Sequence, residues 1–153
     1  MIFKTTFSVS GDNFYPSIVF DKLYGDFIVT NFFNPTDKTF EDRQDVYGYG
    51  GMSFWHPKKF STEDNIREYE MAFVDFIDKN HNLFIEAGAD DFDIFMEIYY
   101  DGEQCNFEIF DKLTLKELTK YSISIPISVY CLPEQEIIKW KNEIEQEWEL
   151  KKT

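Results

Sequence analysis

The stretch Ser122-Ile123-Ser124-Ile125-Pro126-Ile127-Ser128-Val129 alternates small polar and branched apolar residues throughout its length. A period of two residues predicts a strand with one buried face. Pro126 has no amide hydrogen to give to a neighbouring strand, so we expect this strand to lie at a sheet edge or to carry a bulge.

Helices are predicted on both sides of this strand. Thr114 and Glu117 have the spacing of a capping box, which favours a short helix just before it. Pro133 is suited to the first turn of a last helix, residues 133–153. One side of that helix is apolar, which predicts that it docks on the same domain as residues 1–132. The apolar positions are Ile137, Trp140, Ile144 and Trp148.

The rest of the chain completes an alternation of strands and helices. Apolar periodicity predicts strands at residues 3–9, 27–33, 52–56, 92–100 and 105–110, and helices at 15–23 and 61–79. The predicted order is βαββαββαβα. No strand–helix–strand repeat is long enough to demand a parallel sheet. We therefore predict a single α+β domain with a mostly antiparallel sheet and helices packed on one face.

Composition places the chain among ordinary folded domains. Its 153 residues fit one domain, and 43% are hydrophobic, including 17 Phe, which is ample for a packed core. No apolar run approaches membrane-spanning length, and the first residues lack the apolar region of a signal peptide. Only two cysteines are present, without metal-ligand spacing, so we expect a reducing, cytoplasmic setting.

The net charge of −14 limits the classes of partner. Nucleic acids and anionic membranes both attract basic surfaces, so neither is expected to bind. The charge suits a basic protein or a cation. The alternative is that it only keeps the protein in solution.

The negative charge is concentrated between residues 61 and 100, which hold 11 acidic and 2 basic residues. On the predicted helix several carboxylates share one side with Met71, and such a face is either a binding surface or simply solvated. The predicted partner-binding residues are Asp64, Glu68, Met71, Asp75, Asp78, Asp90, Asp91, Asp93, Glu97 and Glu108.

Two of these carboxylates raise the question of catalysis. In the predicted hairpin of residues 92–110, Glu97 lies opposite Glu108, and like charges facing each other destabilise a sheet. The pair is solvated or separated by a bulge, or it meets a cation from the last helix or a partner, or it forms an acid/base pair. Known catalytic motifs are lacking. We therefore predict no catalytic residue and no cofactor.

Metal binding is the remaining chemical possibility. Glu86, Asp90, Asp91 and Asp93 offer the oxygen ligands that Ca²⁺ prefers, but their spacing is not that of an EF-hand. A solvated acidic turn is the favoured interpretation, so we predict no metal site.

Two segments resemble one protein family. Ser10-Gly11-Asp12-Asn13-Phe14-Tyr15-Pro16 is similar to its opening strand and turn, and Leu115-Lys116-Glu117-Leu118 to its closing helix. It is a family of small acidic bacterial domains of unknown function, and the resemblance covers about residues 1–131. A looser likeness is to bacterial immunity proteins, which neutralise toxins. It implies that the acidic face binds a basic toxin domain, for instance a nuclease. The alternatives are an enzyme with paired carboxylates and a structural or regulatory domain.

Overall fold

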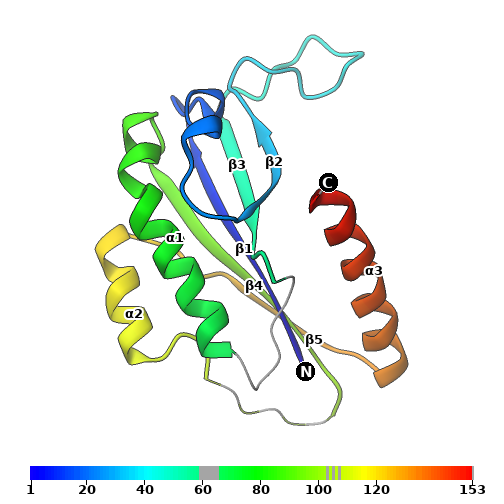
Figure 1. The fold of residues 1–153 in the computed structure, drawn as a ribbon. Helices are drawn as coiled ribbons and strands as arrows, with labels where there is room; N and C mark the ends of the chain where they lie inside the picture. Colours follow the sequence, from blue (N-terminus) through cyan, green and yellow to red (C-terminus); the bar gives the residue numbers. More distant parts are fainter. Residues whose placement is uncertain (59–65, 103, 105, 107, 153) are drawn as a thin grey trace.

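A five-stranded sheet forms the centre of the protein in a computed structural model, which describes residues 1–58, 66–102, 104, 106 and 108–152 (Figure 1). The strand order is β2-β3-β1-β4-β5. Neighbouring strands are antiparallel except β4 and β5, which are parallel. The predicted α+β fold with a mostly antiparallel sheet is confirmed. The strands are β1 (Ile2–Gly11), β2 (Ile28–Phe33), β3 (Gly50–Trp55), β4 (Asp91–Tyr100) and β5 (Ile127–Cys131).

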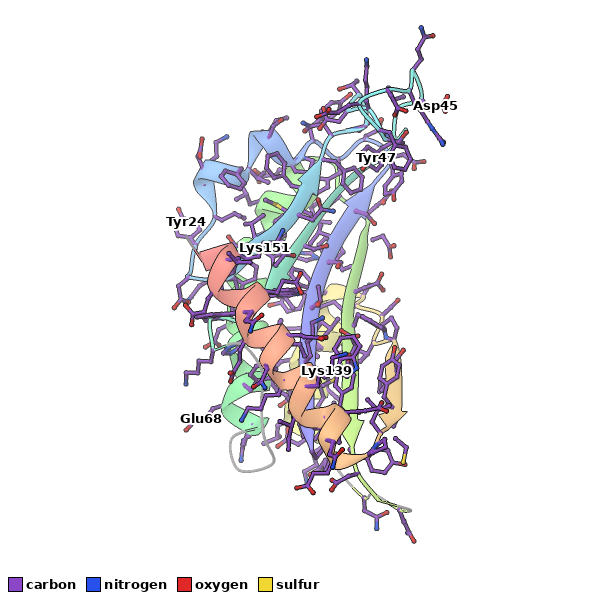
Figure 2. All side chains as sticks on the ribbon, turned by 90° about the vertical axis from the view of Figure 1, so that its right-hand side faces the viewer. Tyr24, Asp45, Tyr47, Glu68, Lys139 and Lys151 are labelled. Atoms are coloured by element: carbon purple, nitrogen blue, oxygen red, sulfur yellow. The ribbon has the colours of Figure 1, made fainter. Side chains whose placement is uncertain are left out.

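Helices cover both faces of this sheet. Helices α1 (Ile66–Glu86) and α2 (Lys112–Leu118) lie on one face, and α3 (Glu134–Lys152) crosses the other (Figures 1 and 2). The prediction that all helices share one face is therefore wrong for α3. The reason is a second apolar patch behind the sheet, where Ile2 and Tyr99 pack against Ile137 of α3.

The main core between the sheet and α1 is built largely from phenylalanine. Phe7 of β1 is fully buried and stacks on Phe54 of β3, with 5.8 Å between the ring centroids. Phe73 and Phe84 of α1 are fully buried as well. Burying one such ring contributes roughly 1.5–3 kcal/mol, so this layer fixes the position of α1 on the sheet.

The predicted hairpin between residues 92–100 and 105–110 does not form. Strand β4 already has a neighbour on each edge, since Met96 lies opposite Thr5 of β1 and Ile127 of β5. No edge of β4 remains for residues 105–110. Cys105 and Phe107 lie outside the described residues, and Gln104, Asn106 and residues 108–110 are not in a strand.

Other element boundaries also differ from prediction. Residues 15–23 form two short 3-10 helices, Pro16–Ile18 and Phe20–Lys22, rather than an α-helix. The predicted capping residues Ser61 and Asp64 lie outside the described residues. Strand β5 is the edge strand that Pro126 indicated.

The long polar segment between β2 and β3 forms a finger that projects from the sheet (Figure 1). Its two sides are joined by a bridge between Lys38 and Val46 and by a 3.0 Å hydrogen bond from the Thr39 amide to the Asp45 carbonyl. At its base Tyr47 stacks on Phe33, with ring centroids 4.0 Å apart. These contacts account for a defined finger rather than an open loop.

Candidate protein-binding surface

Three of the predicted partner-binding carboxylates lie on the exposed side of α1. The Glu68 side chain is 80% exposed, and its carboxylate lies 4.0 Å from the Lys58 amino group. Asp75 is exposed, and Asp78 accepts a hydrogen bond from the Tyr121 hydroxyl. An ion pair as exposed as the one at Glu68 contributes little to stability, so this side of α1 keeps its negative character.

Met71 does not belong to this exposed surface. Its side chain is half-buried against the main core, and its sulfur lies 3.7 Å from the Thr114 hydroxyl of α2. The prediction of Met71 as an exposed anchor is wrong, because α2 covers that side of α1. Asp64, which precedes α1 in sequence, lies outside the described residues.

The predicted residues of β4 lie on the opposite face of the sheet. Asp91, Asp93 and Glu97 alternate with the core residues of β4 and so point away from α1. Asp93 is half-buried, and burial raises its pKa. Asp90 is exposed at the turn before β4. The ten predicted residues therefore do not form one continuous surface.

Glu97 is paired with a cation rather than with Glu108. Its partner in the sheet register is Lys4 of β1, with 3.1 Å between the Lys4 amino group and the Glu97 carboxylate. Glu97 also accepts a 2.9 Å hydrogen bond from the Tyr99 hydroxyl. The carboxylate pair of the predicted hairpin does not exist, and Glu108 is exposed outside any strand.

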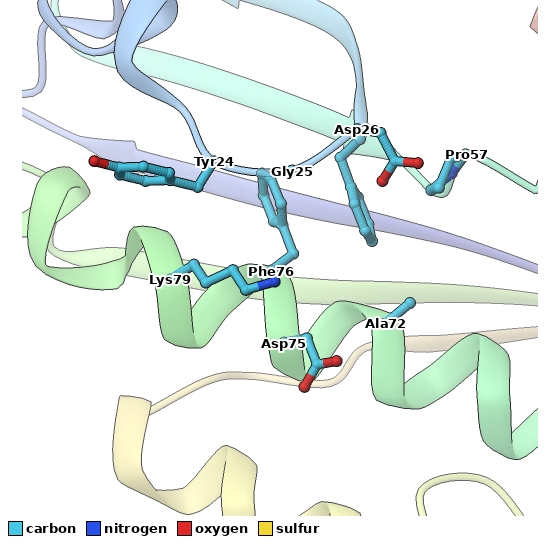
Figure 3. Close-up of a pocket in the computed structure, with 9 residues that line it drawn as sticks. Tyr24, Gly25, Asp26, Pro57, Ala72, Asp75, Phe76 and Lys79 are labelled. Carbon is cyan, nitrogen blue, oxygen red and sulfur yellow. The ribbon is translucent and has the colours of Figure 1, made fainter.

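A small pocket opens beside the acidic side of α1, beneath the segment that leads into β2 (Figure 3). Its volume is about 160 Å³. Its lining includes the stacked rings of Phe27 and Phe76, whose centroids are 4.4 Å apart. Asp26 lines it from the strand side and Asp75 from α1. Carboxylates from two separate elements thus border one aromatic-lined cavity.

Buried Asn80 holds the two walls of this pocket together. Its side-chain oxygen accepts a hydrogen bond from the Tyr24 amide, and its nitrogen donates to the carbonyls of Tyr24 and Phe76, each at 2.8 Å. Next to Tyr24, Gly25 has a φ of +107°, and a Cβ there would lie 3.2 Å from the Phe76 ring. A larger residue at position 25 would be strained by this φ and crowded by the Phe76 ring, so the turn requires glycine here.

Sequence reasoning missed this arrangement. The run Asn80-His81-Asn82 predicts the end of the helix near Lys79, but α1 continues to Glu86. Asn80 falls three residues after Ile77 and four after Phe76, both buried, so it shares their face. An amide at an apolar helix position is the signal that could have indicated a buried contact with a distant backbone.

We expect Asn80→Ala to lower the free energy of unfolding by about 2–4 kcal/mol. The substitution removes one buried and two partly buried hydrogen bonds and leaves both backbone groups of Tyr24 without that partner. Asn82→Ala is the matched control, because Asn82 is exposed on the same helix. Urea unfolding of both variants measures the difference. Equal stability of the two would contradict the assigned role of Asn80.

Two buried titratable groups lie near the other end of α1. Glu70 accepts a 2.8 Å hydrogen bond from the Phe110 amide, and burial raises its pKa to about 7. The His56 ring stacks on Tyr69 with centroids 4.2 Å apart, and its Nδ1 accepts from the Lys58 amide at 2.8 Å. Burial lowers the pKa of His56 to about 4. Neither side chain lines the pocket, so both are assigned to packing.

Within the described part of the chain, no group of three or more His, Cys, Asp or Glu side chains is placed to hold a metal ion. In the same residues, no helix combines the length and apolar character needed to cross a membrane. Comparisons of the chain with known protein families, curated proteins and solved structures found no match. The functional argument therefore depends on the surface itself.

Proposed function

We propose that this chain is a protein-binding module that recognises a basic protein through the exposed side of α1 and the pocket beside it. The observation that carries the proposal is the pairing of Asp26 and Asp75 around an aromatic-lined cavity, with Glu68 and Asp78 exposed on the same helix. A small pocket bordered by two carboxylates beside further exposed carboxylates is an arrangement suited to anchoring a side chain of a basic partner.

The overall charge supports a basic partner. A net charge of −14 accelerates encounter with a positively charged protein and opposes self-association. The most concrete form of the proposal is an immunity protein that neutralises a basic toxin domain, such as a nuclease, in the cytoplasm. In this form the chain acts by occupying the toxin surface.

We favour binding over catalysis. The enzyme alternative depended on Glu97 and Glu108 as facing carboxylates, whereas Glu97 is bridged to Lys4. The two facing carboxylates on which the enzyme alternative depended are therefore not brought together in the sheet. The exposed carboxylates of α1 are suited to attracting a positively charged protein surface.

The test is affinity capture from the native host, followed by kinetics with the protein recovered. We expect Glu68→Gln combined with Asp78→Asn to slow association about threefold to tenfold at low salt and to reduce its salt dependence. The control is Glu136→Gln combined with Glu147→Gln, which removes the same charge from exposed positions on α3. Capture of no basic protein, or equal slowing by both double variants, would contradict the proposal.

A further inference from the structure

We propose that the pocket between residues 24–27 and α1 holds one arginine side chain of the partner. This assignment rests on the proposed function and specifies how its acidic surface would select a partner. The cavity of about 160 Å³ has room for several water molecules, each of which occupies roughly 30 Å³, and therefore for one planar cation.

The lining explains why the occupant is a cation. Asp26 and Asp75 border the pocket from different elements, and no ion pair to either carboxylate is recorded among the residues that the structure describes. A cation that enters the pocket is attracted by the negative charges of both residues. Placement beside a low-dielectric aromatic wall strengthens that attraction relative to open water.

The aromatic residues favour arginine over lysine. Phe27 and Phe76 line the cavity, and the Tyr24 ring at its rim is 66% exposed. A guanidinium group is planar and weakly hydrated, stacks on aromatic rings and donates in several directions to carboxylates. An ammonium group is more strongly hydrated, so it loses more on entering such a pocket.

Lys79 is the one feature of the pocket that opposes a cation. It lines the cavity one helical turn after Asp75, and Figure 3 shows its side chain extending along α1 towards Phe76. An arginine that enters the pocket must displace the Lys79 ammonium group or remain beside it against their mutual repulsion. Removal of that charge should therefore strengthen binding, while neutralising either aspartate should weaken it. A general charge effect would give the same signs, so an equal charge removed at exposed Glu86, outside the pocket lining, is needed to distinguish a local site from it.

The pocket is also prepared for binding. The two hydrogen bonds between Asn80 and the backbone of Tyr24 hold one end of the 24–27 segment in place before any partner arrives. A cavity that already has its shape loses little conformational entropy when it is occupied.

Another groove, formed by described residues, does not fit the same role. It lies along the edge strand β2, and its lining consists of Phe20, Val29, Thr30, Asn31, Phe32 and Lys151. It contains no carboxylate, and the Lys151 amino group already donates to the Thr30 carbonyl at 2.9 Å. A basic partner is not attracted to a groove whose only charge is positive.

The test uses small probes on the intact chain. N-acetyl-arginine amide is titrated into ¹⁵N-labelled protein, with the lysine and citrulline analogues as comparisons. We expect arginine to shift the Gly25 and Ala72 amide signals with a roughly millimolar dissociation constant, lysine to bind more weakly, and neutral citrulline to cause no saturable shift.

Single substitutions then give the sign of each contribution. Asp26→Asn and Asp75→Asn should each weaken arginine binding by about threefold or more, and Lys79→Gln should strengthen it by about twofold. Glu86→Gln, an exposed change near the end of the same helix, should have no effect. Equal shifts from arginine and citrulline, or no saturable shift at all, would overturn the assignment.

The arginine pocket and the proposed binding function can be disproved independently of each other. If arginine does not bind and a basic protein is still captured through Glu68 and Asp78, the arginine pocket is wrong and the acidic binding module stands. If arginine binds the pocket and no basic protein is captured, the pocket assignment stands and the proposed function is wrong.

Discussion

Truncation after Pro133 is expected to lower the free energy of unfolding by roughly 5–8 kcal/mol, or to prevent folding. Helix α3 buries the side chains of Ile137, Ile144 and Trp148 on the sheet, and each fully buried large apolar side chain is worth roughly 1.5–3 kcal/mol. Its removal also exposes Tyr99 and Ile2 on the second face of the sheet. Losses of this size equal the whole stability of many domains of this length.

A single substitution tests the same docking without removing the helix. Trp148 is 4% exposed, and its ring nitrogen donates to the His56 carbonyl at 3.2 Å. Trp148→Ala should cost about 3–5 kcal/mol, whereas Ile138→Ala, at a position exposed on the same helix, should cost less than about 1 kcal/mol. Chemical unfolding measures both. A truncated chain with an unchanged melting temperature would show that α3 contributes nothing to the fold.

The apolar side of α3 could be predicted from sequence, but its place on the sheet could not. Helical periodicity identifies Ile137, Trp140, Ile144 and Trp148 as one stripe. Ile137, Ile144 and Trp148 are buried, whereas Trp140 lies at the edge of the stripe, 42% exposed, with its ring stacked on Tyr99. Periodicity does not say which face of a sheet that stripe covers. The face is determined by Ile2 of β1. Its side chain points to the sheet face opposite the main core, and there it belongs to the small apolar patch that α3 covers.

The candidate site, like α3, could be predicted from the sequence only in part. The charge on α1 follows directly from Glu68, Asp75 and Asp78 in the sequence. The pocket does not, because it joins Tyr24 to Asn80 across 56 residues, and no local pattern reports such a contact. The pairing of Glu97 was predicted wrongly for a related reason. A hairpin is the simplest assumption for adjacent strands, but β4 instead pairs with β1, which is distant in sequence.

The pH dependence of stability should separate into two opposing contributions, from Glu70 and His56. The pKa of Glu70 is raised from 4.5 to about 7 in the folded state, so between those values the folded protein holds a proton that the unfolded chain has released. This contribution to stability falls as pH rises from about 4.5 to 7. The pKa of His56 is lowered from 6.5 to about 4, so its contribution falls as pH drops through that range.

The pH dependences contributed by Glu70 and His56 nearly cancel between about pH 4.5 and 6.5. Substitution of one residue should therefore reveal the contribution of the other. Glu70→Gln keeps an acceptor for the Phe110 amide and removes the titration. Relative to wild type, its free energy of unfolding should rise by about 1.4 kcal/mol per pH unit across the window and reach roughly 3 kcal/mol above pH 7.

His56→Gln should show the reverse trend. Relative to wild type it loses ring packing on Tyr69 at every pH, but it should recover stability as pH falls from 6.5 towards 4, because it no longer excludes a proton that the unfolded chain binds. Urea unfolding at half-unit pH steps measures both curves, and Glu86→Gln, exposed on α1, should give a flat difference. Parallel curves for wild type and Glu70→Gln would mean that Glu70 has the same pKa in the folded and unfolded chain, with its hydrogen bond to Phe110 offsetting the cost of burying its charge.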